Sequence, residues 1–366
     1  MNESAGEKTE KLVNQFCTSL FIKHWTFPNP KKEDNKEVCD CLVVFHSAVI
    51  IVSTKDCSNA PDEKRWRKKA IVKSTRQILG AENYISKGGK VYTRNGEYLA
   101  IPKDSEIIRI GVAFGRKEGY SEIPKISSPE EGKIIHWFDD SAFQAVFKHT
   151  LTFSNFLQYL GCRERVCQEG NALLKDLNDY GLLAMYLNQN GCYAIDALDN
   201  GQKRSDRMWK LFLQSEEYDS FLKNAIASEK FCEIINWIYD QLHKGASKED
   251  ADRILSEFAA LPMKCRRFFV EEFMSLGSFG DRNLSRFTVP RGDHEEEMGV
   301  VLLIEGNPII EYYSSERNSR RQKLIDCCSR WFLEKNCSKC IGLATNKRVE
   351  GMGSSIDACI ISRDSI

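Results

Sequence analysis

Carboxylates, a lysine and an amide occur near the N-terminus, and side chains of these types could bind a metal ion and hydrolyse a phosphodiester. Glu37 and Asp40 come just before the apolar segment 41–45, and Ser53 and Lys55 end the apolar segment that follows. Such hydrolysis needs a metal ion that neutralises charge on the phosphate and lowers the pKa of the attacking water. Mg²⁺ is bound through one or two carboxylates. We therefore predict Asp40 as the main metal ligand and Lys55 as the cation that contacts the water or the phosphate.

The two apolar segments are typical of a β-hairpin whose turn lies near residues 46–48. In such a hairpin Asp40 lies roughly opposite Ser53 and Lys55. Side chains alternate between the faces of a strand, so Ser53 and Lys55 share one face while Thr54 and Asp56 point the other way. A buried carboxylate and a buried ammonium are costly unless they are paired or hold a metal. The end of this hairpin is therefore a candidate site.

Two predicted helices complete this site. The first begins near Ser4 and carries Glu10 at the N-terminal end of its apolar stripe, from where Glu10 could approach the metal. The second spans 62–84 and carries Gln77, which would orient Lys55 or the water. Glu37 is a weaker metal ligand. It lies three residues from Asp40, so on a regular strand it points to the opposite face unless the backbone bends.

This order of elements resembles the restriction-endonuclease-like PD-(D/E)XK nuclease superfamily. The matching residues are Glu10, Glu37, Asp40, Ser53, Lys55 and Gln77. The resemblance implies a mixed β-sheet flanked by helices, a Mg²⁺ or Mn²⁺ cofactor, and cleavage of nucleic acid, with DNA favoured over RNA, in phage defence or repair. The family pattern has Asp or Glu where this chain has Ser53. A second hypothesis is therefore a catalytically inactive protein of this fold that binds nucleic acid or a partner protein as a regulatory subunit.

The helix at 62–84 also carries a group of basic residues. The predicted nucleic-acid-binding residues are Lys64, Arg67, Lys68, Lys69, Lys73 and Arg76. Phosphate contacts from such a group would be strongly salt-dependent. The alternative is a basic helix side that is simply solvated. Further basic clusters, at 266–267 and 317–323, are consistent with binding nucleic acid or a partner, with pairing to carboxylates, or with plain solvation.

Other catalytic chemistries find little support. Cys337 and Cys340 have a zinc-like spacing, but the cysteines upstream at 327–328 are adjacent, so buried or loop thiols are favoured over zinc. The histidines are scattered, and no cysteine lies in a recognisable nucleophile turn. No Walker lysine follows a glycine-rich loop, so an ATP-driven step would need a partner ATPase or helicase.

The composition describes a globular protein without a strong charge bias. The 366 residues contain 52 basic and 52 acidic side chains, and 42% are hydrophobic. A polar N-terminus and the absence of a long apolar run indicate a cytoplasmic protein that does not enter membranes, in which the 14 cysteines are reduced thiols. Self-association is left open.

The fold class predicted from these patterns is α+β or α/β, in three parts. Residues 1–140 form the nuclease-like domain with a mixed sheet flanked by helices. Residues 141–290 are a helical region. Residues 291–366 form a small α+β segment packed on the rest, with strands near 299–304, 309–313 and 340–345 and a helix over 318–335.

Overall fold

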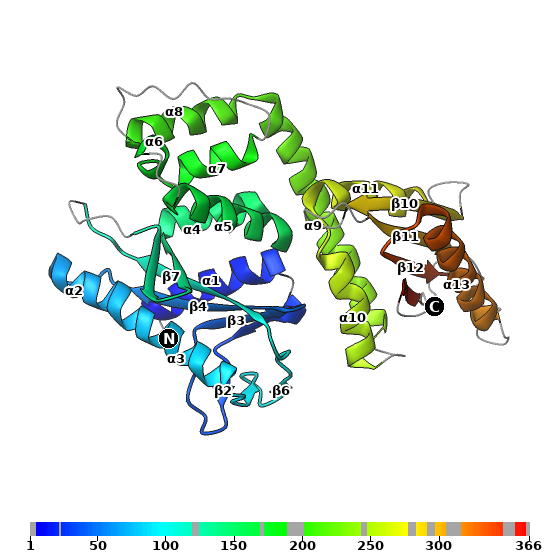
Figure 1. The fold of residues 1–366 in the computed structure, drawn as a ribbon, viewed down its shortest axis with the longest axis horizontal. Coiled ribbons are helices and arrows are strands. Elements are labelled where there is room, and N and C mark those ends of the chain that lie inside the picture. Colours follow the sequence, from blue (N-terminus) through cyan, green and yellow to red (C-terminus); the bar gives the residue numbers. More distant parts are fainter. Residues whose placement is uncertain are drawn as a thin grey trace. The chain divides into compact units, whose positions relative to one another are not determined.

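The computed structural model describes most of the chain as two compact units. It describes residues 5–21, 23–118, 124–168, 172–188, 201–242, 247–276, 283–290, 297–304, 316–346 and 356–363. Contacts divide the chain into Met1–Ser220 and Phe221–Ile366, whose elements are labelled in Figure 1. The expected helix start at Ser4 and the expected strand at 309–313 lie outside the described residues.

A mixed six-stranded sheet flanked by helices forms the N-terminal unit, as predicted. The strands lie in the order β1-β3-β4-β7-β9-β8. Their bounds are β1 Thr26–Pro28, β3 Cys41–Phe45, β4 Ala48–Asp56, β7 Glu106–Phe114, β8 Ile126–Glu130 and β9 Lys133–Asp139. The pairs β1–β3, β3–β4 and β8–β9 are antiparallel, whereas β4–β7 and β7–β9 are parallel. The predicted hairpin is the β3–β4 pair, which turns at His46 with a φ of 52°.

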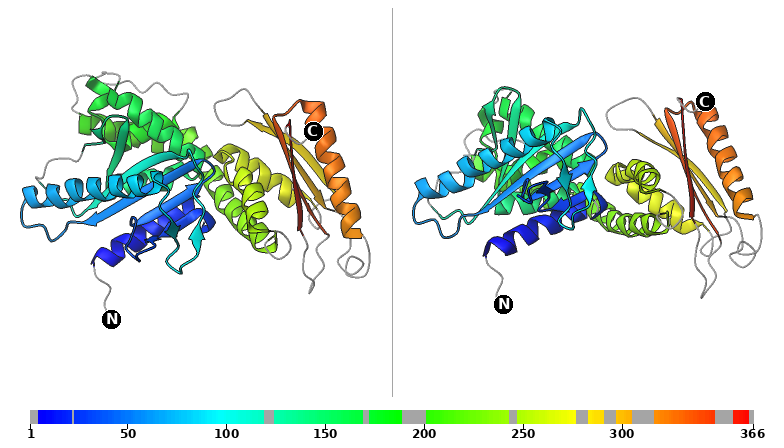
Figure 2. Two further views of the ribbon diagram at one scale, coloured as in Figure 1. Left: turned by 60° about the horizontal axis from the view of Figure 1, so that its bottom comes forward. Right: turned by 90° about the horizontal axis from the view of Figure 1, so that it is seen from below.

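The helices of this unit cover both faces of the sheet. Their bounds are α1 Ala5–Phe21, α2 Glu63–Arg67, α3 Ser74–Ser86, α4 Asp140–Thr150, α5 Phe153–Gln168, α6 Ala172–Lys175, α7 Asp179–Leu187 and α8 Gly201–Leu213. Figure 2 shows the sheet between α1 on one side and the α2–α3 segment on the other. On the α3 side, Val49 and Ile51 of β4 pack with Ile78 of α3. Because side chains alternate, Ser53 and Lys55 continue this same face.

The segment from α2 to α3 is one continuous helix that contains a π-helical stretch, η2 Lys68–Lys73. Trp66, Ala70, Ser74 and Ile78 are buried along it at intervals of four residues. In an ideal α-helix such a row drifts by about 40° at each step, because a turn holds 3.6 residues. The wider turns of η2 offset this drift. The π-helical stretch therefore keeps one row of side chains on the sheet and leaves the basic residues outside.

Close packing on β7 determines the surface of the sheet beside the candidate site. Ser53 pairs with Gly111 in the β4–β7 register. A Cβ on Gly111 would lie 2.2 Å from the Trp137 ring. Only glycine therefore lets Trp137 cover the strand at this point. A small three-stranded sheet, β2 Lys31–Lys32, β5 Val91–Tyr92 and β6 Tyr98–Leu99, lies in the same unit.

The C-terminal unit combines helices with a four-stranded sheet of order β10-β11-β12-β13. The strands are β10 Leu284–Pro290, β11 Glu297–Ile304, β12 Lys339–Thr345 and β13 Ile356–Ser362. The helices are α9 Glu216–Leu242, which belongs to this unit from Phe221 onward, α10 Lys248–Ala259, α11 Met263–Ser275 and α13 Glu316–Lys335. Helix α13 packs on the sheet through Leu324, Cys328 and Phe332. This small sheet with its helices matches the expected C-terminal α+β segment, although β10 and β13 were not predicted.

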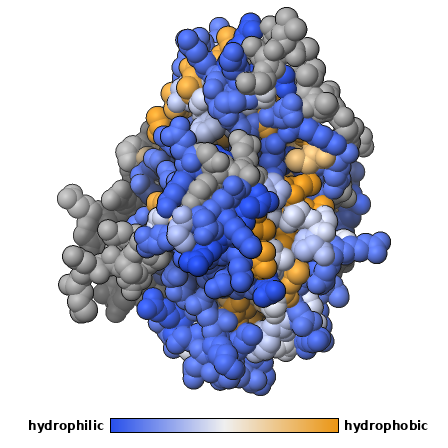
Figure 3. All heavy atoms as spheres, turned by 90° about the vertical axis from the view of Figure 1, so that its left-hand side faces the viewer, coloured by the Kyte–Doolittle hydropathy of each residue, from blue (hydrophilic) through white to orange (hydrophobic). Residues whose placement is uncertain are grey.

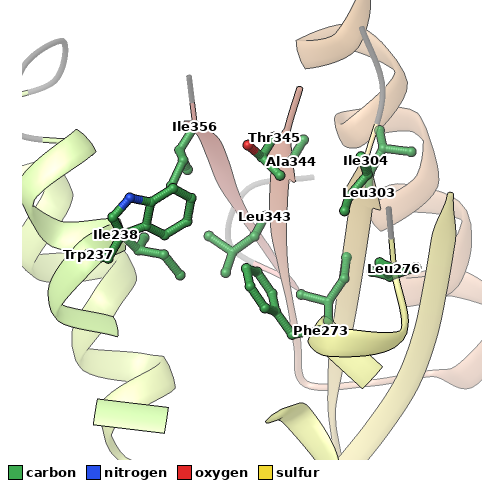
Figure 4. A pocket seen from close by; sticks show the side chains of 11 residues that line it. Trp237, Ile238, Phe273, Leu276, Leu303, Ile304, Leu343, Ala344, Thr345 and Ile356 are labelled. Atoms are coloured by element: carbon green, nitrogen blue, oxygen red, sulfur yellow. The ribbon is translucent and has the colours of Figure 1, made fainter. Parts of the chain in front are cut away.

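Apolar side chains from α9 and α11 meet the same sheet. Figure 4 shows Trp237 and Ile238 of α9 and Phe273 of α11 around Leu343 of β12. The cavity between them is about 10 Å³, roughly the space of one water molecule. This region is therefore packed core rather than a ligand site.

The boundary between the units lies inside the segment 141–290 that we expected to form one helical region. Helix α4 contacts β7, β9 and α7, whereas α10 contacts β13 and α11 contacts β10. Tertiary contacts thus assign the first helices of that segment to one sheet and the last to the other. The helices of this segment are short in several places: α6 is separate from α7, α8 from α9, and Pro262 lies between α10 and α11.

Candidate active site

Asp40 is the centre of the candidate site, and four donors surround its carboxylate. The residue directly precedes β3 and is 6% exposed. Its Oδ2 accepts hydrogen bonds from the Thr54 amide, from the Thr54 hydroxyl at 3.3 Å and from Lys55 Nζ at 3.3 Å. Its Oδ1 accepts a hydrogen bond from Gln77 Nε2 at 3.0 Å. These bonds compensate the cost of burying a charged group.

The hairpin register brings Ser53 and Lys55 to Asp40. Cys41 pairs with Val52, so one further step places Asp40 opposite Ser53. Ser53 is fully buried. Lys55 keeps 21% of its side chain exposed and forms an ion pair with Asp40. The lysine is therefore held by the carboxylate while it can still be reached from solvent.

Gln77 joins Ser53 to Asp40 from the facing helix. Its Oε1 accepts a hydrogen bond from Ser53 Oγ at 3.1 Å, and its Nε2 donates to Asp40 Oδ1. The two bonds fix the orientation of the amide, because only one arrangement satisfies both partners. The structure thus brings together Asp40, Ser53, Lys55 and Gln77, which come from three separate segments of the chain.

Glu37 also reaches Asp40, which differs from our expectation for a regular strand. The chain bends at Val38 and Asp40 instead of running straight into β3, and the carboxyl group of Glu37 lies next to that of Asp40. Glu37 is an exposed residue, but partial desolvation of its carboxyl group and the adjacent Asp40 carboxylate raise its pKa to about 7. Glu37 therefore keeps its proton to a higher pH than an ordinary glutamate.

The raised pKa of Glu37 has a defined effect on stability. The folded protein holds the Glu37 proton up to a pH of about 7, whereas an unperturbed glutamate loses it near 4.5. The folded state therefore binds more protons between these values, and the free energy of unfolding falls as the pH rises through this window. A cation bound between the two carboxylates would remove this penalty.

Glu10 lies at the outer side of the same group. It is half-buried on α1, and its Oε2 accepts a hydrogen bond from Asn29 Nδ2 at 3.4 Å. The backbone N–H of Asn29 in turn donates a hydrogen bond to the Asp40 backbone carbonyl at 3.0 Å. The negative charge of Glu10 contributes to the raised pKa of Glu37. Asn29 therefore connects Glu10 to the site, although no direct bond joins Glu10 to Asp40 within the described residues.

The carboxylates fit a divalent cation in charge and donor type. Glu37 and Asp40 lie in contact, Glu10 is close enough to act on Glu37, and Mg²⁺ needs only one or two carboxylates beside water or phosphate oxygens. In the part of the chain that is described, no set of three or more His, Cys, Asp or Glu side chains is already arranged around one point. The candidate is thus a two-carboxylate site rather than a preformed protein cage.

The basic residues of the α2–α3 segment form an exposed surface. Lys64, Arg67, Lys68, Lys69, Lys73 and Arg76 are all exposed. Lys69 Nζ donates to the carbonyl of Asp56 at the end of β4, which places this lysine beside the strand that carries Lys55. Helix α2 lies on the side of the molecule that faces the viewer in Figure 3, where hydrophilic side chains predominate.

Two of the other sequence patterns contain buried side chains. Arg266 is fully buried, and its guanidinium donates to the carbonyls of Leu261 at 3.1 Å and Ala259 at 2.7 Å, at the end of α10. Cys337 and Cys340 are buried under α13. All cysteines in the described ranges are free thiols.

Two residues of the site were not predicted. Thr54 was placed on the opposite face, yet its amide and its hydroxyl both reach Asp40. A hydrogen bond from the backbone amide does not depend on the type of side chain, so the sequence does not indicate it. Asn29 lies between β1 and β2 and has a φ of 47°, a left-handed conformation in which asparagine is enriched. The Pro-Asn-Pro sequence was the available signal for this turn.

Comparison with known proteins does not assign a family. No family model and no curated protein matches the chain. None of the helices within the described residues is both long enough and apolar enough to cross a membrane.

Proposed function

We propose that the N-terminal unit is a metal-dependent nuclease that hydrolyses phosphodiester bonds, with DNA as the favoured substrate. The observation that carries this proposal is the contact of Asp40 with Lys55, Gln77 and Glu37 at the end of the β3–β4 hairpin. The topology agrees with it, because an antiparallel hairpin, a helix and a parallel strand follow one another as β3, β4, α3 and β7. A role in phage defence or repair belongs to the proposal through the resemblance alone.

Each side chain has a distinct task in this proposal. Asp40 and Glu37 would hold Mg²⁺ or Mn²⁺, with Glu10 as the next carboxylate. When bound, the ion supplies charge neutralisation on the phosphate and a lower pKa for the attacking water. Lys55 donates a hydrogen bond to that water or to a phosphate oxygen. Gln77 keeps Asp40 oriented, and Ser53 keeps Gln77 oriented, so the carboxylate does not have to reorganise during the reaction.

A second function is favoured by one specific observation. Ser53 supplies a neutral hydroxyl that is already bonded to Gln77, so it adds no charge to the metal site. A protein with this arrangement could bind nucleic acid or a partner protein without cleaving it. The substitution Ser53→Asp separates the two functions: cleavage that occurs only in this variant would identify a binding protein with a decayed site.

The direct test is a cleavage assay on purified protein. Supercoiled plasmid, linear duplex, single-stranded DNA and RNA are each incubated with EDTA, Mg²⁺ or Mn²⁺, beside Lys55→Ala as the inactive reference. We expect nicking or degradation that requires the metal and is lost in the variant. The absence of cleavage on every substrate, with salt-sensitive binding retained, would support the second function and refute the first.

The raised pKa of Glu37 predicts a pH-dependent metal affinity. A ligand carboxylate must be deprotonated, so protons compete with the metal below the Glu37 pKa of about 7. We expect the Mn²⁺ affinity of the wild-type protein to rise about tenfold between pH 6 and pH 8. Calorimetric titration at the two pH values measures this change. In Glu37→Gln the affinity at pH 8 should be lower and nearly independent of pH. An equal rise in the variant would exclude Glu37 as a ligand.

The exposed basic helix predicts salt-dependent binding of duplex DNA. In Arg67→Ala/Lys68→Ala, two exposed cations are removed from α2 and η2. We expect the slope of log Kd against log salt to fall by about 2 relative to wild type, because each lost phosphate contact removes about 0.9. Fluorescence anisotropy with labelled duplex in EDTA measures this slope without cleavage. The matched control is Arg207→Ala/Lys210→Ala, which removes two exposed cations from α8 and should leave the slope unchanged. An equal decrease of the slope in both variants would mean that DNA binding depends only on the net charge of the protein.

A further inference from the structure

The C-terminal unit also contains a larger cavity. It has a volume of about 430 Å³ and lies between α10, the start of α13 and the strand β13. Strand β13 is the edge of its described sheet, so the cavity is bounded on one side by a strand flank that has no neighbouring strand there. Cavities of this size accommodate small organic ligands.

Three arginines of α13 meet one carboxylate at this cavity. Asp357 of β13 accepts hydrogen bonds at Oδ1 from Arg317 Nε at 3.2 Å and from Arg321 Nε at 2.6 Å. Its Oδ2 accepts from Arg320 Nε at 2.8 Å and also from Arg320 Nη2. Burial by itself would raise the pKa of Asp357, but the bonds from Arg321 and Arg320 outweigh it and lower this pKa. Asp357 is therefore charged and holds the three guanidinium groups in place.

Only one of the three arginines is needed to neutralise Asp357. Arg320 is 1% exposed and binds the carboxylate through two nitrogens, which satisfies a buried ion pair. The side chains of Arg317 and Arg321 are 42% and 50% exposed. Both donate to Asp357 through Nε, and Arg317 Nη2 also donates to the Ile356 carbonyl at 3.4 Å. For Arg321, no bond from its terminal nitrogens is found within the described residues.

The wall of the cavity therefore carries an excess of positive charge. Arg320 matches the charge of Asp357, and Arg253 pairs with Asp250 at 3.7 Å. The charges of Arg317 and Arg321 are not matched by any other described carboxylate that lines the cavity. Apolar side chains also line the cavity, among them Leu242, Ile254, Leu324, Ile325 and Ile360.

We propose that this cavity binds a small organic phosphate ester, whose phosphate is held by Arg317 and Arg321 and whose uncharged body lies on the apolar wall. Fixed guanidinium groups bind phosphate through paired hydrogen bonds. Their fixation by Asp357 lowers the ordering cost of binding, because the side chains are already in place. This site belongs to the C-terminal unit and is independent of the proposed cleavage by the N-terminal unit.

Calorimetric titration of the full chain in EDTA tests the site with three probes. AMP supplies a phosphate ester with a body, adenosine supplies the body alone, and inorganic phosphate supplies the charge alone. We expect AMP to bind at least about tenfold more tightly than adenosine, because the charge-assisted hydrogen bonds are then made. We also expect AMP to bind more tightly than inorganic phosphate, since it buries apolar surface.

Substitutions on α13 assign the binding to this cavity. Arg317→Gln and Arg321→Gln should each weaken AMP binding at least about tenfold, while Asp357 keeps its pair with Arg320 and the unit stays folded. The matched control is Arg330→Gln, which removes an exposed arginine of the same helix that does not line the cavity. No binding of any probe, or equal binding by all variants, would overturn the proposal. Equal affinity for AMP and inorganic phosphate would overturn the assignment of an organic ester.

Discussion

Lys55→Ala is expected to reduce the rate of metal-dependent phosphodiester cleavage by about 10²–10³-fold at saturating substrate. The Lys55 ammonium lies 3.3 Å from Asp40 Oδ2 and is the basic group that the hairpin places beside the predicted ligands Asp40 and Glu37. Its hydrogen bond to the attacking water or to the phosphate strengthens as negative charge develops, so its loss acts on the rate more than on substrate affinity. Initial rates against plasmid concentration, at fixed Mg²⁺, separate kcat from KM.

The fold should survive this substitution. Asp40 keeps three further donors, two from Thr54 and one from Gln77, so the buried carboxylate is not left unsatisfied. The matched control is Lys103→Ala, which removes an exposed lysine from the loop before β7 and should keep full activity. Unchanged thermal unfolding of Lys55→Ala is part of the expected result. If kcat were also unchanged, Lys55 would not be catalytic and the proposed nuclease site would be refuted.

Asp179→Asn is expected to destabilise the N-terminal unit by about 3–5 kcal/mol. Arg163 is 1% exposed. It donates to Asp179 Oδ1 at 2.7 Å and to Oδ2 at 2.9 Å, and also to the carbonyls of Lys125 and Trp137. Tyr159 also donates to Asp179 at 2.7 Å. Removing the carboxylate charge leaves a buried guanidinium without its counter-ion, and water cannot replace it.

Thermal unfolding followed by circular dichroism measures this loss. We expect the transition of the N-terminal unit to fall by about 10 °C or more. The matched control is Glu130→Gln, which breaks an ion pair with Lys133 at 2.6 Å in which the Glu130 side chain is 52% exposed. Surface pairs of this kind contribute less than about 1 kcal/mol. A similar small effect of Asp179→Asn would show that Arg163 is satisfied by the backbone carbonyls alone.

The local sequence pattern was enough to predict which side chains share a face at the candidate site. The apolar segments and the turn at His46 define the β3–β4 hairpin, and alternation along β4 then places Ser53 and Lys55 on the side where α3 packs. The burial pattern of the helix at 62–84 likewise leaves its basic residues outside. These features depend on neighbours a few residues apart, which is the range over which periodicity is informative.

Tertiary structure decided the distances and the partners. The bend between Glu37 and Asp40, the reach of Gln77 across to Ser53, and the bonds from Thr54 all depend on segments that are distant in sequence. The boundary between the two units was decided by which sheet each middle helix covers. A sequence with equal numbers of acids and bases also gives no sign that Arg317 and Arg321 meet at one cavity while Arg266 is buried elsewhere. Periodicity fixes the direction of a side chain relative to its own element, but burial and pairing are fixed only when elements pack together, because desolvation and charge interactions depend on distances in space.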